Sequence, residues 1–208
     1  MHRRMYSDEE GALSVRIARE AVEAHASGRA MQSFTVPARF EEKAGVFVTL
    51  SLYPSAELRG CIGYPQPLYP LFKALVKSAE EACEDPRFPP LGADEIDRVT
   101  VEVNLLTPPQ RIEVRRPKEY LKAIELGQDG LEIRYATARG VFLPAVPVAQ
   151  GWDVETYLME LCIKAGLTPD TWLDDDARIY KFRSAVFGEV EPRGAVVRRN
   201  LEAEDASR

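Results

Sequence analysis

The hexapeptide LRGCIG at residues 58–63 contains the residue types best suited to chemistry. In a β-strand, Arg59 and Cys61 would share one face, about 6.5–7 Å apart. A guanidinium beside a thiol favours the thiolate, which is the nucleophilic form. Gly60 and Gly63 weaken a strand, so they indicate a bulge or the close approach of another group. The alternative is that Cys61 is a small buried residue and Arg59 forms a structural ion pair.

Two further segments place polar side chains where they could take part. Asp85 and Arg87 belong to a proline-rich loop that continues through Phe88. Such a loop could present both charges into a cleft, or it could be fixed by a salt bridge between them. Glu102 and Asn104 lie on the polar face of an alternating strand, and that face either meets water or lines a cavity.

The other cysteines and the histidines limit the chemistry. Cys83 and Cys162 fall on the apolar faces of predicted helices, where core packing is the usual role. The histidines are His2 and His25 alone, and the three cysteines are far apart, which excludes a Cys/His zinc site of standard spacing. We therefore expect no metal site and no cofactor, and a Cys–His catalytic pair is nearly excluded.

Composition and charge exclude several classes of protein. The 208 residues include 27 basic and 33 acidic side chains, for a net charge of −6, with 45% hydrophobic and 29% charged residues. This balance argues against a nucleic-acid-binding surface. No apolar run approaches the roughly 18–20 residues that span a bilayer, and the first residues do not resemble a signal peptide. We expect a cytoplasmic protein that binds neither nucleic acid nor membranes.

The elements that must position these residues follow from hydrophobic periodicity. Helices are predicted over residues 9–27, 68–83, 117–124 and 154–165, with a short helical turn over 169–173. Strands are predicted over residues 46–53, 57–64, 99–106, 111–114, 130–135 and 177–190, and 140–148 is predicted to be extended. The strands at 46–64 should form an antiparallel hairpin, and Val101, Val103 and Leu105 should lie in the core. Because no regular βαβ spacing is present, the sequence predicts an α+β fold with a mostly antiparallel sheet flanked by helices.

Several blocks of the sequence resemble, in the same order, those of the AMMECR-one domain family, also known as protein A of the AmmeMemoRadiSam system. The resemblance covers about residues 13–189. It rests on the hexapeptide and on FVTL at 47–50, DPRFPPL at 85–91, VEVNLL at 101–106, LP at 143–144, GWD at 151–153, KAGL at 164–167 and Trp172. The chain departs from the family pattern at Ala145 and Ala149, where glutamine and glutamate are usual, so a chemical role for that block is weakened.

The resemblance implies a single domain over residues 1–192, in which a larger and a smaller intertwined subdomain share a core and a sheet. It places the hexapeptide near the cleft between them. No enzymatic activity is established for the family. Its genes lie beside those of a Memo-type protein and a radical S-adenosylmethionine protein, which implies these two as partners. Residues 193–208, outside the domain, are predicted to be a disordered tail.

Two functions from different classes fit these residues. The first is a binding or accessory module that holds a small anionic ligand or a partner segment through Arg59 and Arg87. The second is an enzyme with Cys61 as nucleophile. Because arginine stays protonated and cannot shuttle a proton, and no histidine is available, we favour binding. The predicted catalytic residues are Cys61, Arg59, Asp85 and Glu102, and the predicted ligand-binding residues are Arg59, Gly60, Gly63, Arg87, Phe88 and Asn104.

The same residues give a geometric expectation. The side chains of Arg59, Cys61, Asp85, Arg87 and Glu102 come from three separate segments and should converge in one pocket. Either Asp85 or Glu102 should pair with an arginine there.

Overall fold

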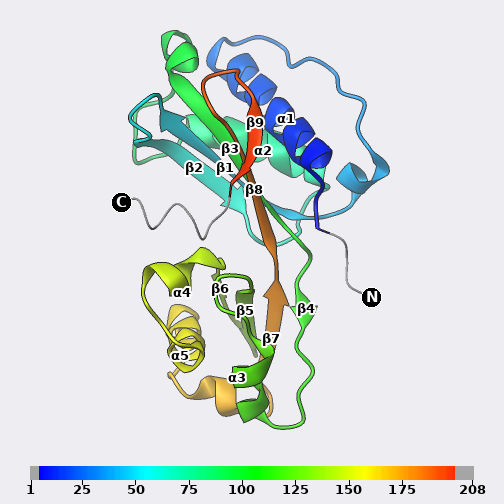
Figure 1. The fold of residues 1–208 in the computed structure, drawn as a ribbon, viewed down its shortest axis with the longest axis vertical. Helices are drawn as coiled ribbons and strands as arrows, with labels where there is room; N and C mark the ends of the chain where they lie inside the picture. The colour runs from blue at the N-terminus through cyan, green and yellow to red at the C-terminus, as the bar shows by residue number, and fades with distance from the viewer. Residues whose placement is uncertain (1–4, 200–208) are drawn as a thin grey trace. The chain divides into compact units, whose positions relative to one another are not determined.

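The computed structural model describes residues 5–199, which divide into two compact units (Figure 1). Unit 1 comprises residues 5–106 together with Ala185–Arg199, and unit 2 comprises Thr107–Ser184. Unit 1 is therefore assembled from two separate stretches of the chain, whereas unit 2 is continuous.

Unit 1 contains a five-stranded sheet in the order β2-β1-β3-β8-β9. The strands are β1 (Gly45–Leu52), β2 (Leu58–Tyr64), β3 (Val99–Leu106), β8 (Ser184–Glu189) and β9 (Val196–Arg199). β1 pairs antiparallel with both β2 and β3, and β8 pairs antiparallel with β9. The predicted hairpin and its antiparallel neighbour at 99–106 are confirmed. β2 is an edge strand.

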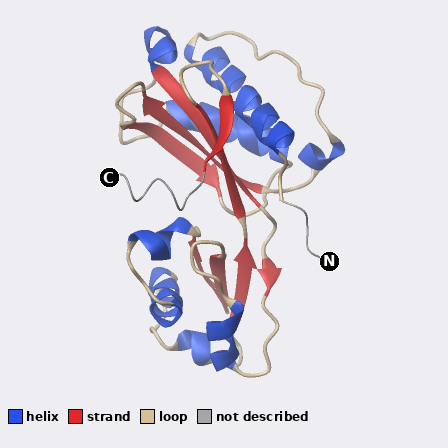
Figure 2. Ribbon diagram, viewed as in Figure 1, coloured by secondary structure: helices blue, strands red, loops and turns tan. Residues whose placement is uncertain are grey.

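Two long helices of unit 1, α1 (Asp8–Ala26) and α2 (Leu71–Cys83), cover the same face of this sheet (Figure 2). α1 begins at a capping box, in which the Ser7 hydroxyl accepts the Glu10 N–H and the Glu10 carboxylate accepts the Ser7 N–H. Short 3-10 helices, η1 (Ala38–Glu41) and η2 (Ala93–Arg98), lie in the connections. The face of the sheet turned away from α1 and α2 is called the far face below.

Strict alternation sorts the residues of the central strands between the two faces. On the helix side, Val101, Val103 and Leu105 of β3 are fully buried, which confirms the core prediction. Across β1, the apolar residues Val48 and Leu50 are likewise buried against the helices. The intervening residues of β1 and β3 therefore point to the far face.

A buried ion pair joins α1 to the sheet. The Arg19 guanidinium bonds the Glu189 carboxylate at the end of β8 and donates to the Val99 carbonyl, 2.7 Å away. The same carboxylate accepts the Val101 N–H at 2.9 Å. A buried charge is tolerated only when it is paired and hydrogen-bonded, so this network fixes α1, β3 and β8 together.

Unit 2 contains a four-stranded antiparallel sheet in the order β4-β7-β5-β6. Its strands are β4 (Gln110–Arg111), β5 (Gly130–Tyr135), β6 (Ala138–Phe142) and β7 (Arg178–Phe182). Its helices are η3 (Pro117–Glu119), α3 (Tyr120–Ala123), α4 (Ala145–Ala149), α5 (Val154–Lys164) and η4 (Thr171–Leu173). Leu131 and Ile133 of β5 pack with Tyr157, Leu158 and Leu161 of α5 in a second apolar core.

The predicted α+β fold with antiparallel pairing and flanking helices is confirmed. The expectation that the two subdomains share one sheet is wrong, because the strands form two sheets. The long strand predicted over 177–190 is in fact β7 and β8, which belong to different sheets. The chain changes sheet at Arg183, whose N–H and carbonyl both bond Thr107. The backbone groups of Arg183 are therefore satisfied by Thr107 and not by the regular hydrogen bonds of a continuous strand.

Two local predictions are also wrong. Residues 145–149 form α4 rather than an extended segment, because Pro147 lies in the first turn, where its missing N–H breaks no helical bond. The predicted disordered tail contains β9, which pairs with β8. Arg198 of β9 also bonds Asp8 and the Tyr6 carbonyl, so charged residues there form specific contacts. The rest of the predicted tail, residues 200–208, lies outside the described residues.

No helix within residues 5–199 combines the length and the apolar character required to cross a membrane.

Gly60 provides a test of how closely β2 packs against α2. A Cβ at Gly60 would lie 2.2 Å from the Ala82 carbonyl oxygen, and backbone cannot move aside as a side chain can. We expect Gly60→Ala to lower the free energy of unfolding by roughly 1–3 kcal/mol in urea titrations. Gly92→Ala is the matched control, because the one close approach of its Cβ, at 2.6 Å, is to the flexible Asp94 carboxylate and not to backbone. Equal effects of the two substitutions would contradict this close packing.

Candidate functional site

The Asp85 carboxylate bonds the edge of β2 to the loop that follows α2. Its Oδ2 accepts the Cys61 N–H at 2.9 Å, and its Oδ1 accepts the Arg87 N–H at 3.1 Å. An edge strand presents unpaired backbone groups, and here a side chain satisfies one of them. The Asp85 side chain is only 1% exposed, so the carboxylate is buried at this junction.

Arg87 is oriented by the same carboxylate. Its Nε donates to Asp85 Oδ1 at 3.0 Å and its Nη2 donates to Asp85 Oδ2 at 2.6 Å. Nη2 also donates to the Cys61 carbonyl at 3.3 Å, so both backbone groups of Cys61 are bonded by this loop. The Arg87 side chain is 55% exposed, and its Nη1 makes no hydrogen bond to the described residues. A fixed arginine therefore presents free N–H donors to solvent beside Cys61.

These bonds control the ionisation of Asp85. The hydrogen bonds from the Arg87 guanidinium hold the pKa of the Asp85 carboxyl well below its usual value, and the N–H groups of Cys61 and Arg87 act in the same direction. Burial opposes this shift but is outweighed. Asp85 is therefore ionised at neutral pH, and its acceptor positions are occupied by four donors.

Arg59 occupies a bulge in β2. Leu50 pairs with Gly60 and Ser51 pairs with Leu58, so Arg59 is the extra residue between them. Its Nε and Nη2 each donate to Glu95 of η2 at 2.9 Å, in a bidentate pair. The Arg59 side chain is 9% exposed. The guanidinium bonds lower the pKa of Glu95, and the Gly92 N–H contributes to the same shift. Arg59 thus forms a structural ion pair with Glu95, and its own side chain is buried.

The Cys61 thiol points to the far face and contacts Thr49 of β1. Because the Cys61 N–H and carbonyl face Asp85 and Arg87, Cys61 and Thr49 form a non-hydrogen-bonded pair, in which side chains lie closer together. The Thr49 hydroxyl donates to Cys61 Sγ at 3.3 Å. Cys61 is partly exposed. The thiol is therefore accessible and already holds one hydrogen-bond donor.

Glu102 and Asn104 lie on the same face, two strands from β2. Glu102 pairs across the strands with Thr49, and Asn104 pairs with Phe47. The spacing of neighbouring strands puts the Cα atoms of Glu102 and Cys61 roughly 10 Å apart. Glu102 lies 3.9 Å from the Arg199 guanidinium. The Asn104 Oδ1 atom is buried and accepts no hydrogen bond from the described part of the chain, so it retains acceptor capacity on the far face.

The remaining cysteines are core residues, as predicted. Burial raises the pKa of the Cys83 thiol to about 12 and that of the Cys162 thiol to about 11, which keeps both protonated at neutral pH. Among residues 5–199, no group of three or more histidine, cysteine, aspartate or glutamate side chains is placed to hold a metal ion.

The structure brings some of the predicted site residues together and separates others. Cys61, Asp85 and Arg87 are joined by direct hydrogen bonds, and the expected pairing of Asp85 with an arginine is present. The Arg59 guanidinium bonds Glu95 and the Pro90 carbonyl and makes no contact with the Cys61 thiol. The Phe88 ring lies near both arginines. Its centroid is 5.6 Å from the guanidinium carbon of Arg87 and 6.0 Å from that of Arg59.

Both predicted glycines mark close approaches. Besides the contact of Gly60 with α2, a Cβ at Gly63 would lie 2.3 Å from the Val46 carbonyl oxygen. Sequence reasoning missed Thr49 and Glu95. A signal for Thr49 exists, because it is a polar residue inside an apolar strand of the hairpin and aligns with Cys61. Glu95 lies in a charged helical turn that resembles any solvated segment, so no local signal marks it.

Comparison with known proteins gives consistent results. A family model described as AMMECR1 matches residues 15–187. A protein of Methanocaldococcus jannaschii is 50% identical over 199 residues, covering 95% of this chain and 99% of the relative. A protein of Thermococcus gammatolerans is 48% identical over 200 residues, covering 93% and 97%. The crystal structure of an uncharacterized protein from Pyrococcus horikoshii is similar, with a TM-score of 0.77 and 46% identity over 93% of this chain and 98% of that one.

The bonds of Asp85 predict the effect of removing its charge. Asp85→Asn keeps one oxygen for the Cys61 N–H and Arg87 Nη2, without the negative charge. Its NH2 group replaces the oxygen that accepts the Arg87 N–H and Nε, so those two bonds are lost. At pH 7 we expect the free energy of unfolding to fall by roughly 1.5–3 kcal/mol, measured by urea titration. Asp94→Asn is the control, because its 85% exposed side chain makes only a 3.5 Å contact with Arg98. Its expected effect is below about 0.5 kcal/mol.

The lowered pKa of Asp85 also predicts a pH dependence. A carboxyl whose folded-state pKa lies below its unfolded value stabilises the fold above the unfolded pKa, which is about 4, and this contribution is lost as the pH falls below it. The difference in stability between the wild type and Asp85→Asn should therefore shrink between pH 5 and pH 3. A difference that stays constant over this range would show that Asp85 does not carry the interaction.

Proposed function

Since the chain belongs to the AMMECR1 family, we propose that it is a binding component that holds a small molecule carrying an anionic group between Arg87 and Cys61. The two groups lie on adjacent parts of one site, because Arg87 bonds the Cys61 carbonyl. In this role the chain supplies or retains a ligand for other proteins rather than completing a reaction by itself.

The observation that carries this proposal is the way in which Asp85 holds Arg87. A planar guanidinium recognises carboxylate or phosphate oxygens through paired N–H groups. In this site Nε and Nη2 donate to Asp85, which fixes the plane of the guanidinium. Nη1 makes no hydrogen bond to residues 5–199, and the side chain is 55% exposed. A donor that is already oriented loses little conformational entropy when a ligand binds.

Charge limits how strongly an anion can be held. Asp85 neutralises Arg87, and Glu95 neutralises Arg59, so the site offers hydrogen-bond donors rather than excess positive charge. The structure therefore favours a ligand recognised by geometry, through donors of Arg87 and acceptor or thiol groups near Cys61. In this proposal Arg59 and Asp85 support the site, and Phe88 provides an aromatic surface beside Arg87.

A catalytic Cys61 is the second candidate. In its favour, the thiol is partly exposed and receives a hydrogen bond from Thr49, which would stabilise a thiolate. Against it, no base contacts Sγ among the described residues. Asp85 is saturated with donors and its pKa is lowered, so it is a poor proton acceptor. Glu102, roughly 10 Å away across two strands, could act on Cys61 only through a ligand or water.

We also propose that the chain acts in a modification pathway with a Memo-type protein and a radical S-adenosylmethionine protein. This proposal is supported by the gene association that family membership implies. Co-purification of the tagged chain with each of these two proteins from the same organism tests it, and failure of both to co-purify would contradict it.

Ligand identity and binding can be tested together. Small molecules that co-purify with the wild-type protein are identified by mass spectrometry and then titrated calorimetrically against Arg87→Met, Cys61→Ser and the control Arg98→Met. If the chain is a binding component, Arg87→Met should weaken its affinity for the co-purified molecule at least about tenfold, whereas Cys61→Ser should change that affinity less than about fivefold. Arg98→Met should have no effect. Loss of turnover in Cys61→Ser with unchanged affinity would instead establish the catalytic role.

Thiol alkylation gives an independent measurement. A half-buried thiol in a binding site should react with iodoacetamide at pH 7 no faster than free cysteine, because access is restricted. Since Cys83 and Cys162 are buried, mass spectrometry of the alkylated peptide containing Cys61 isolates the relevant rate. A rate far above that of free cysteine would favour the nucleophile.

A further inference from the structure

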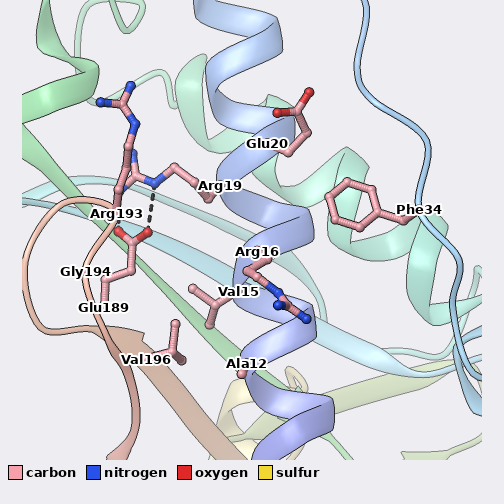
Figure 3. Close-up of a pocket in the computed structure, with 10 residues that line it drawn as sticks. All are labelled: Ala12, Val15, Arg16, Arg19, Glu20, Phe34, Glu189, Arg193, Gly194 and Val196. Atoms are coloured by element: carbon pink, nitrogen blue, oxygen red, sulfur yellow. Dashed lines mark hydrogen bonds and ion pairs between the residues drawn. The ribbon is translucent and has the colours of Figure 1, made fainter.

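Unit 1 contains a pocket that lies apart from Cys61, between α1, the segment around Phe34 and the β8–β9 hairpin (Figure 3). Its volume is about 430 Å³, which is within the range of small-molecule sites. Ala12 of α1, Phe34 and Val196 of β9 supply apolar parts of its lining. None of these residues belongs to the sequence motifs or to the site described above.

The charged residues of the lining are mostly paired. Arg19 bonds Glu189 in the buried ion pair of unit 1. Arg193 bonds Glu23 at 2.6 Å and also contacts Asp97. These charges are already compensated, so they offer little to a ligand.

Arg16 is the exception within the described part of the lining. It is exposed, and its side chain makes no hydrogen bond or ion pair with residues 5–199. Glu20 lies one turn further along α1, the spacing at which an acid could pair with Arg16. Glu20 is instead occupied by Arg29, at 2.6 Å and 3.0 Å, and by the Gln32 N–H at 2.8 Å. Within residues 5–199, the positive charge of Arg16 therefore has no ion-pair partner.

Figure 3 shows how these groups are arranged. Ala12, Arg16 and Glu20 follow one another along the same side of α1, and Phe34 lies across from them. The pocket therefore combines apolar walls with a single free guanidinium at its edge. Neither a bare inorganic anion nor a neutral hydrocarbon would use both features.

We propose that this pocket binds a small molecule with an apolar body and one carboxylate, such as a medium-chain carboxylic acid. The apolar body lies against Ala12, Phe34 and Val196, and the carboxylate pairs with the Arg16 guanidinium. Burial of apolar surface supplies most of the binding free energy, and the arginine selects the charged end. This second site is independent of the ligand proposed for Arg87 and Cys61.

Octanoate and 1-octanol form a matched pair of probes, because they share the same chain length and differ in charge. Calorimetric titration and ¹H–¹⁵N spectra of the full chain should show octanoate binding, with shifts in the amides of α1. Arg16→Gln should weaken octanoate binding by roughly tenfold and leave octanol binding unchanged. Ala12→Phe fills the pocket and should weaken the binding of both probes. Arg98→Gln, an exposed arginine of η2 outside the lining, is the control and should bind both probes as the wild type does.

The proposal is overturned if octanoate does not bind at millimolar concentration, or if Arg16→Gln and Ala12→Phe bind it like the wild type. Arg16 is exposed, so its substitution should not disturb folding, and circular dichroism checks this for each variant. Light scattering tests a different occupant. If a second copy of the chain fills the pocket, the wild type will be a dimer that Ala12→Phe converts to a monomer, and the small-molecule proposal is then wrong.

Discussion

The site depends on one buried carboxylate at the end of a helix. Asp85 lies just beyond α2 and accepts hydrogen bonds from the Cys61 N–H and from Arg87. A single side chain thereby closes the outer edge of β2, shapes the loop after α2 and fixes the direction of a guanidinium. Because the Asp85 carboxylate is almost inaccessible to water, leaving it without these hydrogen bonds would be costly. The position of Arg87 relative to Cys61 follows from this interaction.

A second ion pair, formed by Arg59 at the bulge in β2, lies beside the Asp85 interaction. An extra residue in the strand turns the Arg59 side chain toward Glu95 of η2, where both groups are partly or wholly removed from water. The two ion pairs differ in exposure: Arg59 is buried, whereas Arg87 is half exposed. Arg59 and Arg87 therefore serve different purposes: Arg59 holds the fold, and Arg87 faces solvent.

Local patterns in the sequence predicted much of this structure. Alternation in β3 and the apolar faces of α1 and α2 gave the right elements, because burial on one face imposes a period that is visible in a single chain. The close packing at Gly60 and Gly63 was signalled by glycine within a strand. The bidentate partner of Arg59 was not predictable, because Glu95 is 36 residues away and its turn has no distinguishing composition. The break between β7 and β8 was also missed, since both flanking segments favour strands and only the bonds of Arg183 to Thr107 interrupt them.

The division of unit 1 into two stretches has a consequence for its synthesis on the ribosome. β1, β2 and β3 leave the ribosome long before β8, which follows all of unit 2 in the chain. Until β8 arrives, the nascent sheet has an unpaired β3 edge, and Arg19 lacks the carboxylate that neutralises it. Unit 2, being continuous, has all its strands available before unit 1 does. Vectorial folding of unit 1 must therefore end with β8, which carries Glu189, and with β9, which pairs with β8. Until β8 arrives, the nascent protein exposes the open edge of β3 to aggregation.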